Sequence, residues 1–156
     1  MKKVFSLQIL LICIIVLLGC AQPVAPDDTA GLKDCGTNKE CISDATKQCE
    51  KAFAVITEKS QSPEADIGLK ISIFGLDGEN CKISYKMEKI TVDPKSKDAA
   101  IAQVMAVMLQ GKSMACLVPK EELGNYDAFG AAQVKDLKKQ CTGPLVDALL
   151  NVVPNR

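Results

Sequence analysis

The sequence predicts an α+β fold in which helices lie on one face of a small antiparallel sheet, itself a hairpin plus one or two short strands, stabilised by disulfides. Residues 67–73 and 81–87 both alternate apolar with polar side chains, as strands with one buried face do. The Asp77-Gly78 pair between them is a turn signal, so the two segments should form an antiparallel hairpin. Helical apolar spacing in 101–109 predicts a helix over the sheet, and six cysteines in the same part of the chain predict the disulfides.

Two longer helices are expected around this hairpin. The first begins near Thr37 or Asn38, either of which can cap it. Its apolar stripe comprises Cys41, Ile42, Ala45 and Cys49. The second helix starts in 93–96 and ends at Gly111, because glycine is favoured just after a helix. The side chains expected to cover the sheet from this second helix are Ile101, Val104, Met105, Met108 and Leu109.

Shorter elements are expected elsewhere along the chain. Residues 53–58 could continue the first helix or form a short strand, and their β-branched side chains favour the strand. Residues 114–118 should form a short strand or an extended segment that ends at Pro119. Apolar spacing in 134–141 predicts another helix, and a Gly-Pro pair separates it from a last helical turn or two in 145–152.

Cysteine usage indicates an oxidised domain. Besides Cys13 and Cys20 near the N-terminus, the chain has six cysteines: Cys35, Cys41, Cys49, Cys81, Cys116 and Cys141. An even count in an exported domain favours three disulfides, and all fifteen pairings stay open. Metal ligation is the alternative, but no two of the six have the C-x2-C or C-x4-C spacing of a zinc site, and the chain has no histidine. We therefore expect no metal.

The N-terminus has the pattern of an export signal. Residues 1–3 include two lysines, residues 9–18 are apolar, and the small residue Gly19 stands just before Cys20. An uncleaved membrane helix is the alternative interpretation. The apolar run is shorter than the roughly 20 residues that a spanning helix needs.

The four residues Leu17-Leu18-Gly19-Cys20 resemble the lipobox of bacterial lipoprotein precursors. The resemblance implies that a diacylglyceryl group is attached to the Cys20 thiol, that a signal peptidase cuts after Gly19, and that the new amino group can be acylated. It also implies a location on the cell membrane or outer membrane, with the domain outside the cytoplasm.

Three regions follow from this interpretation. Residues 1–19 are the lipoprotein signal peptide, and 20–33 are the lipidated cysteine and a flexible tether that contains prolines and little apolar periodicity. Residues 34–153 form a single disulfide-stabilised domain, and no second apolar segment is long enough to cross a bilayer.

A second resemblance lies in the cysteine-containing motifs of the domain. The arrangement is similar to uncharacterised small exported six-cysteine proteins, which implies a fold and an oxidised thiol set but no activity. The motifs are Asp34-Cys35-Gly36-Thr37, Cys41, Cys49, Met114-Ala115-Cys116 and Cys141-Thr142-Gly143-Pro144.

Composition excludes several function classes. The absence of histidine removes Ser-His-Asp and Cys-His pairs and the usual general base, so we expect neither an enzyme nor a cofactor. The chain has 19 basic and 19 acidic side chains, and its single arginine is Arg156, so nucleic acid is not an expected partner. Asp77, Glu79 and Asn80 could hold calcium, but they lack the spacing of a calcium loop and have a sufficient role as a hairpin tip.

The expected function is a non-enzymatic binding or structural interaction module, with an envelope protein as its partner. One alternative is a lipoprotein that carries a small apolar ligand between helix and sheet, in a cavity lined by Ile71, Tyr85, Met105 and Met108. Packing of the two methionines in the core is the competing interpretation. A helix on an antiparallel sheet also resembles the cystatins, and a cystatin-like inhibitor is a further alternative, although the chain has no Gln-x-Val-x-Gly segment.

One partner contact is predicted on a loop. Tyr126 and Phe129 lie among glycine and asparagine residues, between Cys116 and Cys141. Aromatic side chains on loops held by a rigid scaffold are frequent interface anchors. The alternative is that both rings fold back and seal the edge of the sheet.

Overall fold

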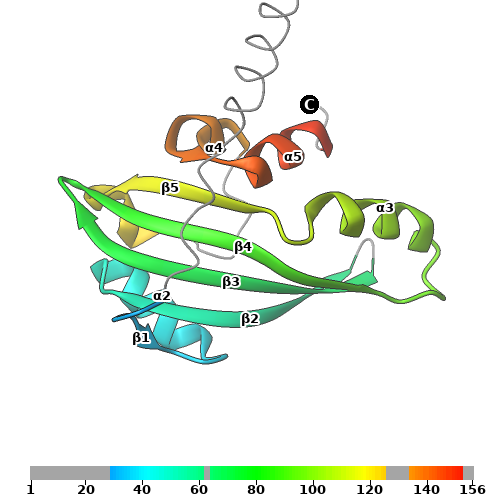
Figure 1. Cartoon of the computed structure of the whole chain (residues 1–156), viewed down its shortest axis with the longest axis horizontal. Coiled ribbons are helices and arrows are strands. Elements are labelled where there is room, and N and C mark those ends of the chain that lie inside the picture. The colour runs from blue at the N-terminus through cyan, green and yellow to red at the C-terminus, as the bar shows by residue number, and fades with distance from the viewer. Residues whose placement is uncertain (1–28, 62–63, 126–133, 153–156) are drawn as a thin grey trace, which may run out of the picture.

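The computed structural model describes residues 29–61, 64–125 and 134–152. Within these ranges the chain forms a six-stranded sheet whose strands are neighbours in the order in which they occur along the chain (Figure 1). The strands are β1 (Lys33–Asp34), β2 (Ala52–Gln61), β3 (Glu64–Asp77), β4 (Asn80–Val92), β5 (Ser113–Pro119) and β6 (Cys141–Thr142). The helices are α2 (Lys39–Gln48), α3 (Ala99–Leu109), the 3-10 helix η1 (Lys120–Asn125), α4 (Val134–Gln140) and α5 (Pro144–Val152).

The α+β class is confirmed, but the sheet is larger than predicted. We expected a hairpin with one or two short strands, and the described residues form six strands. The sheet is also mixed rather than antiparallel, because β1 pairs in parallel with β2. The other four pairs of neighbouring strands are antiparallel. Lys33, assigned to the tether, is the first residue of β1.

The predicted hairpin is formed by β3 and β4 and is longer than its alternating segments. Pairing extends from Asp77↔Asn80 at the tip to Ala65↔Val92 at the far end. Because Asp77 pairs with Asn80, Gly78 and Glu79 form the two-residue turn. Gly78, the first of them, has a φ of 63°, as in a type II′ hairpin.

The predicted alternation in these strands is confirmed, and it gives the sheet an inner and an outer face. Residues paired across β2, β3, β4 and β5 lie on the same face, and successive residues along each strand point to opposite faces. Ser72 and Ser84 are buried although they lie on the outer face. The buried residues of the inner face are Ala52, Ala54, Ile56, Ile71, Ile73, Cys81, Ile83, Tyr85, Cys116 and Val118. The outer face presents Phe53, Val55, Lys70, Lys82 and Leu117.

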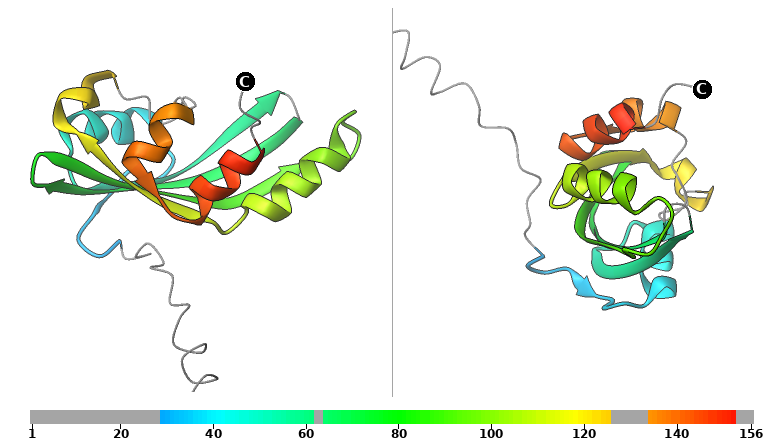
Figure 2. Two further views of the ribbon diagram at one scale, coloured as in Figure 1. Left: turned by 90° about the horizontal axis from the view of Figure 1, so that it is seen from above. Right: turned by 90° about the vertical axis from the view of Figure 1, so that its right-hand side faces the viewer.

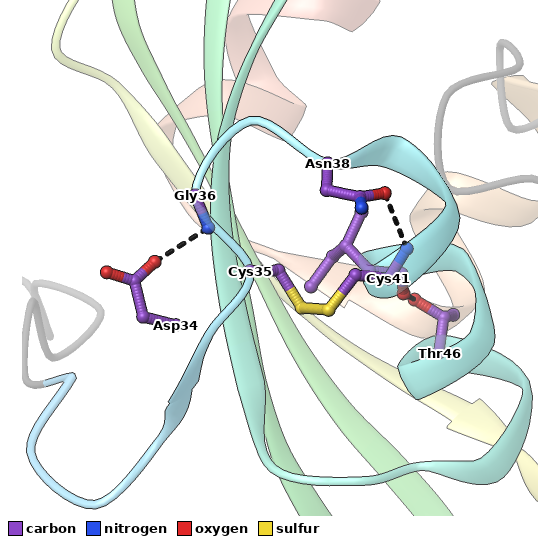
Figure 3. Close-up of a disulfide and its surroundings, with 7 residues drawn as sticks. Asp34, Cys35, Gly36, Asn38, Cys41 and Thr46 are labelled. Carbon is purple, nitrogen blue, oxygen red and sulfur yellow. Dashed lines mark hydrogen bonds between the residues drawn. A yellow bond between two sulfur atoms is a disulfide. The ribbon is translucent and has the colours of Figure 1, made fainter.

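Helix α2 covers the inner face at the β2 edge. The Asn38 side chain caps it by accepting a hydrogen bond from the backbone N–H of Cys41 at 3.0 Å, one of the two caps expected (Figure 3). Ile42 and Ala45 are buried against the sheet. The helix ends at Cys49, which adopts a left-handed conformation with φ 53°.

The six cysteines form the three disulfides that their even number predicted. The pairs, which the sequence left open, are Cys35–Cys41, Cys49–Cys81 and Cys116–Cys141. The first closes the turn into α2 (Figure 3), the second joins the end of α2 to β4, and the third joins β5 to β6. The first and third bridges therefore lie at the two edges of the sheet, next to β1 and at β6.

The Asp-Cys-Gly-Thr motif has a structural role at the first of these bridges. An Asp34 carboxylate oxygen accepts a hydrogen bond from the Gly36 N–H at 2.7 Å (Figure 3). Gly36 has a φ of 57°, a conformation that glycine adopts without strain. The Gly36 carbonyl in turn accepts from the Val55 N–H of β2 at 2.9 Å, so the motif builds the turn that brings Cys35 to Cys41.

Helices α4 and α5 lie along the β5 edge of the sheet (Figures 1 and 2). Both occur where apolar spacing predicted them. Gly143 stands before α5 with a φ of 121°, and a β-carbon there would lie 2.8 Å from the Ser113 carbonyl oxygen. The Cys-Thr-Gly-Pro motif thus combines a bridge, a close backbone approach and a proline at the first position of a helix.

Candidate functional site

Helix α3 differs from the other helices of the domain because it has no charged residue. Gln103 is its single polar side chain. A helix that is apolar all round is normally buried on all sides. Yet α3 lies at one end of the sheet, away from the β3–β4 turn and beyond the end of β5 (Figures 1 and 2).

One side of α3 packs on the inner face of the sheet. Ala102 and Leu109 are buried, and Met105 packs against the core cluster. A small apolar cavity of about 60 Å³ remains between this side of the helix and strand residues that include Ile67 and Ile90.

The opposite side of α3 is exposed and equally apolar. Ile101 is 62% exposed, Val104 60%, Val107 84% and Met108 39%. We call these four side chains the α3 outer stripe. Contiguous exposed apolar surface is uncommon on soluble domains and marks sites of interaction with proteins or membranes.

The outer stripe corrects the predicted orientation of this helix. Ile101, Val104 and Met108 were expected to cover the sheet together with Met105 and Leu109, but the first three point to solvent. The helix is rotated so that the small side chain of Ala102 faces the sheet, which allows a close approach. Helical spacing could not identify the buried side, because no charged residue marks the solvent side. Core packing is confirmed for Met105 and wrong for Met108.

Lysines precede and follow helix α3 in the sequence. Lys95 and Lys97 precede α3 and are exposed, and Lys112 follows it. The acids nearby in the sequence are Asp93 and Asp98. An Asp93 carboxylate oxygen accepts a hydrogen bond from the Lys95 backbone N–H at 2.8 Å, as part of the turn that leads into the helix.

The outer face of the sheet is a weaker candidate. Val55 and Leu117 are exposed there, but lysine side chains interrupt the apolar surface. The Lys82 ammonium lies 5.9 Å from the centre of the Phe74 ring, and the Lys70 ammonium lies 6.0 Å from that of Phe53. These contacts have the geometry of cation–π pairs. Such pairs are a sufficient structural explanation for the lysines and aromatic rings on this face.

Charged side chains gather at two other places, the end of β2, β3 and β4 and the tip of the β3–β4 hairpin. No group of three or more metal-ligating side chains is found in the described part of the chain. An open groove of about 830 Å³ at the end of β2, β3 and β4 is lined by charges of both signs, among them Lys59, Glu64 and Asp66. Asp77 and Glu79 are exposed at the hairpin tip, the position expected for them.

Three of the site residues predicted from the sequence lie outside the described residues. They are the lipid attachment residue Cys20 and the candidate partner contacts Tyr126 and Phe129. Sequence reasoning missed Val107, the most exposed member of the outer stripe. The signal that could have identified it is the absence of charge throughout 99–109.

Comparisons with protein-family models, with curated proteins and with solved structures found no match to this chain. Among the described helices, none is both long and apolar enough to span a bilayer.

Proposed function

We propose that this protein is a membrane-anchored envelope lipoprotein and that its domain is a non-enzymatic interaction module. The lipid anchor is Cys20, which ends the lipobox-like segment Leu17-Leu18-Gly19-Cys20. The domain behind it, with three disulfides, suits an oxidising compartment outside the cytoplasm.

The observation that supports an interaction role is the α3 outer stripe. Its four apolar side chains face solvent on a helix whose other side already packs against the sheet. The fold does not need them in the core, and exposed apolar side chains without a contact lower solubility. A contact made by this stripe explains why a helix with no charged residue is placed at the surface.

The size of the cavity beneath α3 favours this role over the carriage of an apolar ligand. Pockets for ligands of drug size typically have volumes of ~300 Å³ or more. The cavity under α3 is about 60 Å³, and Ile71 and Tyr85, expected to line a larger one, are buried in the packed core. A cavity of that size accommodates a few water molecules.

The proposed anchor is tested by the substitution Cys20→Ser, which replaces the thiol sulfur with a hydroxyl oxygen. The Cys20→Ser protein should incorporate no labelled palmitate and should not be cut after Gly19, because its thiol is the proposed site of lipid attachment. The wild type should need detergent, since two or more acyl chains hold a protein stably whereas one does so only marginally.

The matched control is Cys13→Ser, which removes a thiol from the same N-terminal segment. It should label and fractionate as the wild type does. Palmitate incorporation into the Cys20→Ser protein, with cleavage after Gly19, would show that the proposed anchor is wrong.

A further inference from the structure

The α3 outer stripe has the composition of a surface that meets lipid. Its centre is formed by Ile101, Val104, Val107 and Met108, which are exposed and uncharged. We propose that this stripe inserts into the interfacial region of the bilayer to which the chain is tethered, an inference that rests on the proposed lipid anchor. The domain then has two attachments to one membrane, the acyl chains and α3.

Three of the five charged residues that flank the helix in the sequence are lysines, and Asp93 and Asp98 are the two acids. Lys95 and Lys97 at one end and Lys112 at the other can direct their ammonium groups to lipid phosphates while the aliphatic stems stay with the apolar stripe. The eleven residues of α3 extend about 16 Å at 1.5 Å per residue. A helix of this length lies in the plane of the interface and does not cross the hydrocarbon core, which is about 30 Å thick.

The length of chain between the anchor and the domain allows this contact. The described structure begins at Thr29, and the nine residues from Cys20 to Asp28 span at most about 30 Å when fully extended. Helix α3 packs near Ile67 of β3, and β1 reaches the sheet beside the Ile73 end of the same strand. Those two positions are about 20 Å apart at 3.3 Å per residue. The tether therefore holds the domain within reach of the bilayer.

A bilayer fits this surface better than a folded protein does. Stable protein interfaces bury about 800 Å² on each partner and need a complementary shape. The outer stripe is one side of a single helix with four large apolar side chains. A fluid lipid surface needs no such complementarity. Tethering also raises the effective concentration of the bilayer at the stripe, so that a weak intrinsic affinity suffices.

Tryptophan fluorescence tests the proposal, because the chain has no tryptophan. The Val107→Trp protein is purified from membranes with its lipid and reconstituted into vesicles of neutral and anionic phospholipids. In vesicles its emission should lie at shorter wavelength than that of an indole in water, and lipids brominated on their acyl chains should quench it. The effect should be stronger in anionic vesicles, because the bordering lysines favour them.

Leu117→Trp is the matched control. Leu117 is an exposed apolar residue of the same tethered domain, but it lies on the outer face of the sheet, on β5. Its indole should emit as if in water and escape the brominated lipids, which excludes a general attraction of tryptophan to the interface. Adding Val104→Gln to the Val107→Trp protein should reduce the quenching severalfold, since a polar amide then replaces a central apolar contact.

Three results would overturn the proposal. Emission typical of water in both kinds of vesicle would mean that the stripe does not meet lipid. A shift that is independent of brominated lipids and rises with protein concentration would indicate a second copy or another protein. A shift that depends neither on brominated lipids nor on protein concentration would indicate cover by another part of this chain. Palmitate labelling of the Cys20→Ser protein would instead refute the anchor, independently of the tryptophan emission.

Discussion

Removal of the Cys49–Cys81 bridge should lower the free energy of unfolding by about 4 kcal/mol. The bridge closes a loop of 32 residues, so its loss releases much conformational entropy in the unfolded chain. It also joins Cys49, which ends α2 in a left-handed backbone conformation, to Cys81, which is buried near the start of β4. The variant is Cys49→Ala/Cys81→Ala, and the measurement is chemical denaturation of the purified oxidised protein.

The Cys35–Cys41 bridge provides the matched comparison. Its loop spans six residues, for which the same chain-entropy relation gives about 2 kcal/mol. The Cys35→Ala/Cys41→Ala protein should therefore keep more of its stability than the Cys49→Ala/Cys81→Ala protein. Equal losses in the two variants would contradict an account based on loop length and would indicate that local packing of the sulfur atoms determines the cost.

Truncation of a central core residue should have a comparable effect. Ile83 is fully buried on β4 and pairs with Ile73 of β3 and Cys116 of β5, so it lies in the middle of the inner face. Ile83→Ala removes its larger side chain and leaves a cavity that neighbouring strands cannot fill. We expect a loss of about 2–5 kcal/mol in the free energy of unfolding.

The control for this substitution is Leu117→Ala on the neighbouring strand. Leu117 is an aliphatic residue of similar size that points to the outer face and is 45% exposed. It should lose less than about 1 kcal/mol on truncation, because part of its surface is already in water. If Leu117→Ala costs as much as Ile83→Ala, the assignment of the inner and outer faces is wrong.

The core of the fold could be predicted because its signals are local. Alternation in 67–73 and 81–87 and the intervening glycine determine which residues face the core and where the chain reverses. The cap of α2 was equally visible in Asn38, and the Gly-Pro pair marked the break before α5. Each of these features acts within a few residues along the chain.

The two-residue strands β1 and β6 could not be predicted, because their pairing depends on distant contacts. Lys33 and Asp34 enter the sheet beside β2, next to a turn held by a disulfide. Cys141 is aligned with Cys116 by a bridge whose partner the sequence left open. Their few hydrogen bonds follow from tertiary structure and leave no periodic pattern.

The orientation of α3 escaped prediction for a different reason. Helical periodicity identifies the buried side by contrast with a polar side, and 99–109 offers only Gln103 for that contrast. Stripes through Met105 that included either Val104 or Ala102 were therefore equally consistent with the pattern. The same lack of polarity that obscured the orientation is what makes the exposed side a candidate contact surface.

The mass of the N-terminal peptide of the mature protein, purified from membranes, tests the central claim of a lipid-anchored domain most directly. The account predicts a peptide that begins at Cys20 and has the added mass of a diacylglyceryl group on its thiol, with or without acylation of its amino group. A peptide that begins at Met1, or one that begins elsewhere and contains an unmodified Cys20, would contradict it.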